Sequence, residues 1–172
     1  MELKIVKFFN NLGGKRVSDV TDFASRIPVL AIFWSVVAVL ILILDKNQGG
    51  VIFLALAIAT FLHFFISEGV LKHLLPVFLP RRIRPYLAHP EMIIPNGTLH
   101  QSPSFPSSHM SITLGILMVL FYFYPVIWPV ALLYIIFMAY ARLHNGMHYL
   151  SDIIGGIILG ILYGILSIYL VK

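Results

Sequence analysis

Five long apolar runs limit what this chain can fold into. They cover about residues 27–44, 50–71, 108–124, 126–143 and 149–171. Each is close to the roughly 20 residues that an α-helix needs to cross a bilayer. Because backbone polar groups in lipid must be paired within their own segment, each run is predicted to be helical. The mean hydropathy of +0.93 is typical of a polytopic membrane protein. We expect one all-α domain over residues 1–172, a membrane helix bundle of about five transmembrane helices.

Two segments lie outside these runs. Residues 1–25 mix basic and apolar side chains and predict an interfacial helix that lies on the membrane. Residues 73–106 hold seven of the ten prolines, which prevents a long helix there. We expect this segment to be an extramembrane loop over the site. Following the spans in order, the loop, the N-terminus and the span ends at 72, 107, 143 and 149 share one membrane face.

Charge and cysteine content narrow the function classes. The net charge is +5, and no basic surface interleaved with aromatic residues occurs outside the spans. The excess charge is explained by contact with anionic lipid headgroups, and nucleic-acid binding is not expected. The chain has no cysteine, which excludes disulfides, thiolate catalysis and zinc sites with cysteine ligands. No obligate protein partner is evident.

The most informative cluster lies where the last two apolar runs meet. It contains Arg142, His148 and Asp152. Charge at a bilayer edge is costly and is usually kept for function. His148 and Asp152 are four residues apart, so on a helix the carboxylate could hold the imidazole in one tautomer. The guanidinium of Arg142 suits a phosphate. This set could supply a nucleophile, its orienting group and an anion clamp.

A second cluster, Pro106-Ser107-Ser108-His109, opens the third apolar run. A helix start presents unpaired N–H groups and a positive dipole end, which favour a phosphate. Ser107 could add a hydroxyl donor, and His109 could protonate a leaving oxygen. The structural alternative is an ordinary serine N-cap followed by a histidine at headgroup level.

A third cluster consists of basic residues at and after the end of the second run. Lys72 ends the run, and Arg81, Arg82 and Arg84 follow in the loop, the last directly before Pro85. These cations could form a collar around a phosphate. The alternative is that they anchor the helix end by snorkelling to the interface.

In this order the clusters resemble the type 2 phosphatidic acid phosphatase (PAP2) superfamily. Its signature is Lys, six residues, Arg-Pro; then Pro-Ser-Gly-His; then Ser-Arg, five residues, His, three residues, Asp. The resemblance covers about residues 72–152, and its third part has the same spacing in this chain. Three departures occur: eleven residues separate Lys72 from Arg84, Ser108 replaces the glycine, and Ala141 replaces the first serine of the third part. We expect Arg84 to take the arginine role, with Arg81 or Arg82 as alternatives.

The resemblance implies a mechanism. His148 would attack phosphorus, Asp152 would orient it, and His109 would protonate the leaving oxygen and then activate water. The phosphate oxygens would be bound by Lys72, Arg84, Ser107, Ser108 and Arg142. No metal or other cofactor is expected, since these cations take the place that Mg²⁺ fills in many phosphoryl-transfer sites.

The implied function is that of an integral-membrane lipid phosphatase. The substrates expected from the resemblance are lipid A 1-phosphate, undecaprenyl diphosphate, phosphatidylglycerophosphate and phosphatidic acid. The additional Arg81 and Arg82 favour a headgroup with more than one phosphate. A lipid phosphotransferase, or a channel or transporter, stays open as an alternative. An intramembrane serine protease is disfavoured, because no serine-elbow pattern occurs.

Two further histidines have competing interpretations. His144 lies four residues before His148, and such a pair can bind a metal, although no further ligand is evident. His63 lies within a span and is best explained as a hydrogen-bonded packing residue.

The signals for orientation disagree. Most of the basic residues outside the loop lie on the site face, which would place that face in the cytoplasm. Bacterial members of the PAP2 superfamily, which this chain resembles, usually have the site on the periplasmic side. We expect a multi-pass protein of a bacterial inner membrane with a periplasmic site.

Overall fold

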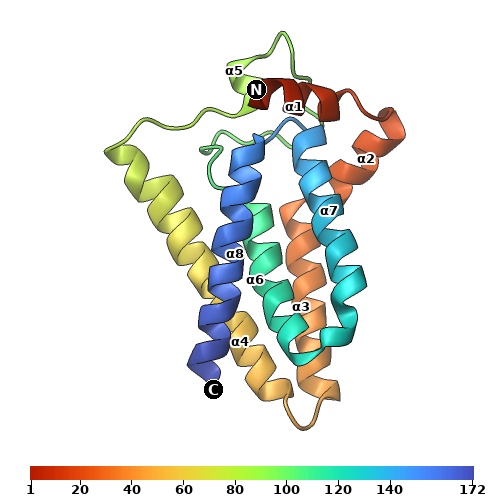
Figure 1. Cartoon of the computed structure of the whole chain (residues 1–172), viewed down its shortest axis with the longest axis vertical. Helices are drawn as coiled ribbons and strands as arrows, with labels where there is room; N and C mark the ends of the chain where they lie inside the picture. Colours follow the sequence, from red (N-terminus) through yellow and green to blue (C-terminus); the bar gives the residue numbers. More distant parts are fainter.

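The computed structural model describes residues 1–172 as an all-helical bundle without strands. The long helices run side by side, and the two chain ends lie at opposite ends of the bundle (Figure 1). They are α3 (Ile27–Leu44), α4 (Gly49–Leu62), α6 (Ser108–Phe123), α7 (Trp128–His144) and α8 (Leu150–Val171). The predicted fold class, a helical membrane bundle, is confirmed.

Four helical segments are long and apolar enough to cross a membrane: 27–44, 49–77, 125–144 and 150–171. The fifth expected span, α6, is shorter, with 16 residues or about 24 Å of helix. Most of its residues are buried, because α4, α7 and α8 surround it. A central helix shielded by its neighbours does not need the length of one that faces lipid.

Small residues let α6 and α8 pack closely. A Cβ atom on Gly160 of α8 would lie 2.5 Å from the Cβ atom of Leu114 on α6. Gly156 and Gly164 are equally tight against α6. The spacing of these glycines, one every four residues, is typical of helix contacts in membranes. It brings the starts of the two helices together, where the Ser107 N–H donates to the Asp152 carbonyl at 3.0 Å.

The second span continues beyond α4 in the wider turns of a π-helix, η1 (His63–Leu74), and a short turn, η2 (Leu75–Val77). The helix therefore extends past the predicted end at residue 71. In a π-helix the hydrogen bonds run from i to i+5. Residues four and five apart consequently share a face, and His63, Glu68 and Lys72 all line the same cavity. Such turns are frequent at functional sites.

The N-terminal segment forms two helices where one was expected, α1 (Glu2–Asn10) and α2 (Lys15–Ala24). The chain turns between them at Gly13, whose φ of +97° favours glycine. Both helices lie at the end of the bundle that holds the connecting loop (Figure 1). The loop itself contains one short helix, α5 (Pro85–Ala88). The Asn10 side chain ties α1 to the loop and to α7 by donating to the carbonyls of Ile94 and His144.

Candidate active site

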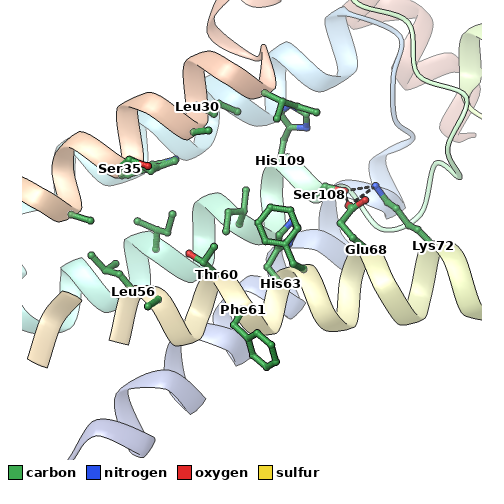
Figure 2. Close-up of a pocket in the computed structure, with 18 of the residues that line it drawn as sticks. Leu30, Ser35, Leu56, Thr60, Phe61, His63, Glu68, Lys72, Ser108 and His109 are labelled. Carbon is green, nitrogen blue, oxygen red and sulfur yellow. Dashed lines mark hydrogen bonds and ion pairs between the residues drawn. The ribbon is translucent and has the colours of Figure 1, made fainter. Parts of the chain in front are cut away.

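A cavity of about 840 Å³, called here the main cavity, lies between α3, the α4–η1 helix and α6. Figure 2 shows Lys72, Glu68 and Ser108 together at one end of it, with Leu56 and Ser35 far from them. Its charged and polar end is lined by Glu68, Lys72, Arg84, His100, Ser102, Ser108, His109, Arg142 and His148. The remaining lining is mostly apolar. The cavity therefore joins a cationic end to a groove suited to hydrocarbon.

The structure brings most of the predicted site residues to this cationic end. Ser107 and Asp152 lie outside the lining, next to it. The Ser107 hydroxyl is buried without a hydrogen-bond partner, and its N–H is bonded to the Asp152 carbonyl. Arg81 and Arg82 do not line the main cavity.

The contacts of His148 define its tautomer. Its Nδ1 atom lies 2.8 Å from the carbonyl oxygen of Ser104, which can only accept, so Nδ1 carries the proton. The other nitrogen, Nε2, is then unprotonated, and its lone pair accepts from the Arg84 guanidinium at 3.3 Å. Both contacts indicate the same tautomer, with the proton on Nδ1 and the lone pair on Nε2.

Asp152 acts on His148 partly through Ser104. Its Oδ2 atom is 3.7 Å from His148 Nδ1, beyond a normal hydrogen bond. The same oxygen accepts from the Ser104 hydroxyl at 2.5 Å and from the Tyr149 N–H at 2.8 Å. The carboxylate thus fixes the residue whose carbonyl orients the imidazole, and lies close enough to stabilise a positive charge on the ring.

Arg82 binds protein groups in this structure. Its guanidinium lies 2.9 Å from Asp152 Oδ1 and 2.8 Å from a carboxylate oxygen of Glu2, and it also bonds the Ser151 hydroxyl at 2.7 Å. Arg81 is exposed and lies away from the cavity. Neither arginine lines the main cavity, so the structure adds no support for a headgroup with several phosphates, and their contact with a headgroup stays a prediction.

Arg84 and Arg142 are both buried but differ in their partners. Arg84 donates to the Ser102 carbonyl at 2.9 Å and to the Met147 carbonyl at 3.1 Å, which fixes it beside His148. Arg142 is only 2% exposed, and no protein group bonds its side chain; its Nε atom is buried without a partner. A buried cation without a partner is costly unless an anion binds it. Burial lowers the pKa of Arg84, and the nearby Tyr86, Asp152 and Glu68 partly oppose this shift.

His109 is held by the N-terminal part of the chain. Its Nε2 atom lies 2.7 Å from the carbonyl oxygen of Ser25, at the junction of α2 and α3. Because a carbonyl only accepts, Nε2 carries a proton, and Nδ1 is the nitrogen free to exchange one.

Lys72, Glu68 and Ser108 form a cluster at the cationic end (Figure 2). The Lys72 ammonium lies 3.2 Å from Glu68 Oε1, and both groups contact the Ser108 hydroxyl. The Lys72 side chain is only 3% exposed, so its charge faces the cavity and not bulk solvent.

Four residues of the site could not be identified from the sequence. Ser104 and Ser25 act through backbone carbonyls, which every residue has. Glu68 was visible only as an acid one turn before Lys72. His100 carried no signal beyond its place in the loop; burial and the nearby cations, Arg84 foremost, lower its pKa.

His144 and His63 are used for packing. His144 bonds the Ser18 hydroxyl at 3.0 Å and the Phe9 carbonyl at 3.1 Å, so both its ring nitrogens are occupied by the N-terminal helices. A metal site shared with His148 is inconsistent with this geometry. His63 bonds the Ser111 hydroxyl on α6 at 2.9 Å, as expected of a packing residue.

His148 should be neutral at pH 6.5. Burial, followed by the charges of Arg84, Arg142 and Lys72, lowers its pKa well below the usual 6.5. As the pH falls through 6.5, a smaller fraction of His148 is therefore protonated in the folded protein than in the unfolded chain. We expect ¹⁵N NMR of the ring in detergent micelles to report the Nδ1–H tautomer at pH 6.5, against a half-protonated ring in the SDS-unfolded protein. A midpoint at or above 6.5 in the folded protein would contradict this.

The chain matches the sequence pattern of the PAP2 superfamily over residues 48–172. Two solved structures are similar in fold. LpxE from Aquifex aeolicus has a TM-score of 0.72 and 21% identity, covering 98% of this chain and 94% of that one. A transmembrane PAP2-type phosphatidylglycerolphosphate phosphatase from Bacillus subtilis has a TM-score of 0.65 and 17% identity, covering 96% and 82%. No curated protein sequence matches the chain.

Proposed function

The chain belongs to the PAP2 superfamily and is a membrane-embedded lipid phosphatase, and we propose that it works through a phosphohistidine at His148. One observation carries this proposal: the main cavity joins a cluster of buried cations and three histidines to an apolar groove between helices. The cationic end suits a phosphate, and the groove suits the attached hydrocarbon chain.

In the first step the Nε2 lone pair of His148 attacks phosphorus. The bond between phosphorus and the lipid-side oxygen breaks. His109 enters this step protonated on both ring nitrogens, donates its Nδ1 proton to that oxygen and keeps the Nε2 proton that bonds the Ser25 carbonyl. The phosphorylated ring gains positive charge, which Asp152 and the Ser104 carbonyl stabilise. Charge on the phosphoryl oxygens is neutralised by cations that the protein holds in place before the substrate arrives. These cations are Lys72, Arg84 and Arg142, with hydroxyl donors from Ser107 and Ser108.

In the second step His109 accepts a proton from water, the water oxygen attacks phosphorus, and the bond to Nε2 breaks. Inorganic phosphate and free His148 result. A second cavity of about 340 Å³ shares His100 and Arg142 with the main cavity and is otherwise mostly polar. It gives water a route to the phosphoryl group, which favours a hydrolase over a phosphotransferase.

The lipid chain lies along the α4–η1 helix in this proposal. Leu56 and Lys72, which line the two ends of the cavity, are sixteen residues apart, which is roughly 24 Å at the rise of an α-helix. Helix α3, on the other side of the cavity, is mostly exposed, with only 6% of its residues buried. A lipid can therefore enter from the bilayer beside α3 without leaving the hydrocarbon.

The test is phosphate release from a panel of lipid mono- and diphosphates in detergent with EDTA. We expect release to continue with the chelator, because protein cations neutralise the phosphate. Loss of release on chelation would contradict the mechanism. Transfer of phosphate to a lipid hydroxyl without free phosphate would instead identify a phosphotransferase.

We also propose that the site faces the periplasm of a bacterial inner membrane. The chain has no cysteine, so a single cysteine at Asn96, in the loop beside the second cavity, gives an unambiguous label. In intact cells we expect an impermeant maleimide to label this variant and not one with cysteine at Asn47, at the other end of the bundle. The reverse pattern would place the site in the cytoplasm.

A further inference from the structure

Glu68 is the one carboxylate in the lining of the main cavity. Its Oε1 atom contacts both the Lys72 ammonium and the Ser108 hydroxyl, whereas its Oε2 atom has no hydrogen bond. The side chain is 27% exposed. An anion inside a site for an anion is unfavourable for binding the phosphate itself, so its place there calls for another role.

Its position along the helix indicates that role. Figure 2 shows Glu68 between Lys72 and His63, one turn from the cationic end toward the apolar groove. When the phosphate of a lipid lies among the cations, the group attached to that phosphate lies at the helical turn that holds Glu68. That group, and not the phosphate attacked by His148, therefore lies beside Oε2.

The net charge of the residues that line the cavity matches the charge of a single phosphate group. Lys72, Arg84 and Arg142 are positive and Glu68 is negative, which leaves a net charge of +2 among the charged lining residues. A phosphate monoester carries about −1.5 to −2 at pH 7. A lipid diphosphate would place its second phosphate against the Glu68 carboxylate, and like charges brought together in this way are strongly disfavoured.

We propose that Glu68 determines specificity: it selects lipid phosphomonoesters whose first group after the phosphate offers a hydroxyl or amide donor, and it rejects lipid diphosphates. Oε2 accepts the hydrogen bond from that donor. The rejection is a repulsive element of the kind that specific sites use against a competing ligand. The inference rests on the proposed function, because it assumes that the phosphate binds at the cationic end.

The test compares two lipids with the same hydrocarbon chain and the same hydroxyl-bearing first group, one a monophosphate and one a diphosphate. Full-length wild type, Glu68→Gln and Glu68→Asp are assayed for kcat/KM in detergent. We expect wild type and Glu68→Asp to prefer the monophosphate, and Glu68→Gln to shift the ratio toward the diphosphate by about tenfold, since the repulsion is lost. Glu91→Gln is the control, because Glu91 is exposed in the loop and should leave the ratio unchanged.

A binding experiment separates this inference from the proposed function. Inorganic phosphate and pyrophosphate are titrated against wild type and Glu68→Gln by calorimetry, which needs no turnover. We expect pyrophosphate to gain about tenfold in affinity relative to phosphate in the variant. An unchanged affinity ratio, or a parallel loss of both lipid activities, would overturn the role of Glu68. Altered binding in a protein that hydrolyses no lipid would support Glu68 and overturn the proposed function instead.

Discussion

Replacement of His148 by alanine should lower kcat/KM for any accepted lipid phosphate by about 10⁴-fold or more, the scale seen when a covalent nucleophile is removed. In the structure Nε2 of this residue carries the lone pair, and burial keeps the ring neutral. His109, the other histidine with a catalytic role in this proposal, differs because its Nε2 atom is bonded to a carbonyl. Any activity that remains in His148→Ala should depend on substrate concentration differently from that of wild type.

The intermediate can be detected directly. Wild type mixed with ³²P-labelled lipid phosphate and quenched in alkali should carry label on the peptide that contains His148, and His148→Ala should carry none. His89→Ala is a suitable control, since His89 lies in the loop outside the main cavity and makes only a long contact to Glu91. Label on any other residue, or label that persists in His148→Ala, would disprove the assignment.

The apolar runs were sufficient to predict the bundle, because the bilayer requires a helix from each of them. The start of α6 and the span ends near Arg142 and Asp152 could also be predicted from the sequence. The order of the spans placed all of them on the same face of the membrane. The wide turns of η1 could not be predicted, since the sequence pattern of this span does not distinguish a π-helix from an α-helix. Only these turns put Glu68 and Lys72 on the face that His63 already occupies.

Among the arginines, sequence reasoning favoured Arg84 but could not assign Arg82. The pairing of Arg82 with Glu2 joins residues 80 positions apart, through a helix that packs on the loop. Its second partner, Asp152, comes from α8. Long-range pairs of this kind follow from tertiary packing, and the pattern of a single sequence does not indicate them. The same holds for the carbonyls of Ser104 and Ser25 that orient the two histidines.

Replacement of Arg142 by methionine should separate activity from stability. We expect kcat/KM to fall by about 10³-fold, because a preorganised cation that meets charge developing on the phosphoryl oxygens is worth about 3–4 kcal/mol. The free energy of unfolding should not decrease. The guanidinium has no protein partner to lose, and methionine fills a similar volume without a buried charge. Inorganic phosphate should raise the melting temperature of wild type and have little effect on this variant.

Arg84→Met is the matched comparison, and it should lower both kcat/KM and the free energy of unfolding. This arginine bonds the carbonyls of Ser102 and Met147, so its removal leaves buried acceptors unpaired at a cost of about 1–3 kcal/mol in unfolding free energy. Activity is measured by phosphate release and stability by thermal unfolding in the same detergent. If Arg142→Met destabilised the protein as much as Arg84→Met, Arg142 would have to be a structural cation. If instead only activity falls, its burial without a partner is explained by the phosphate that it binds.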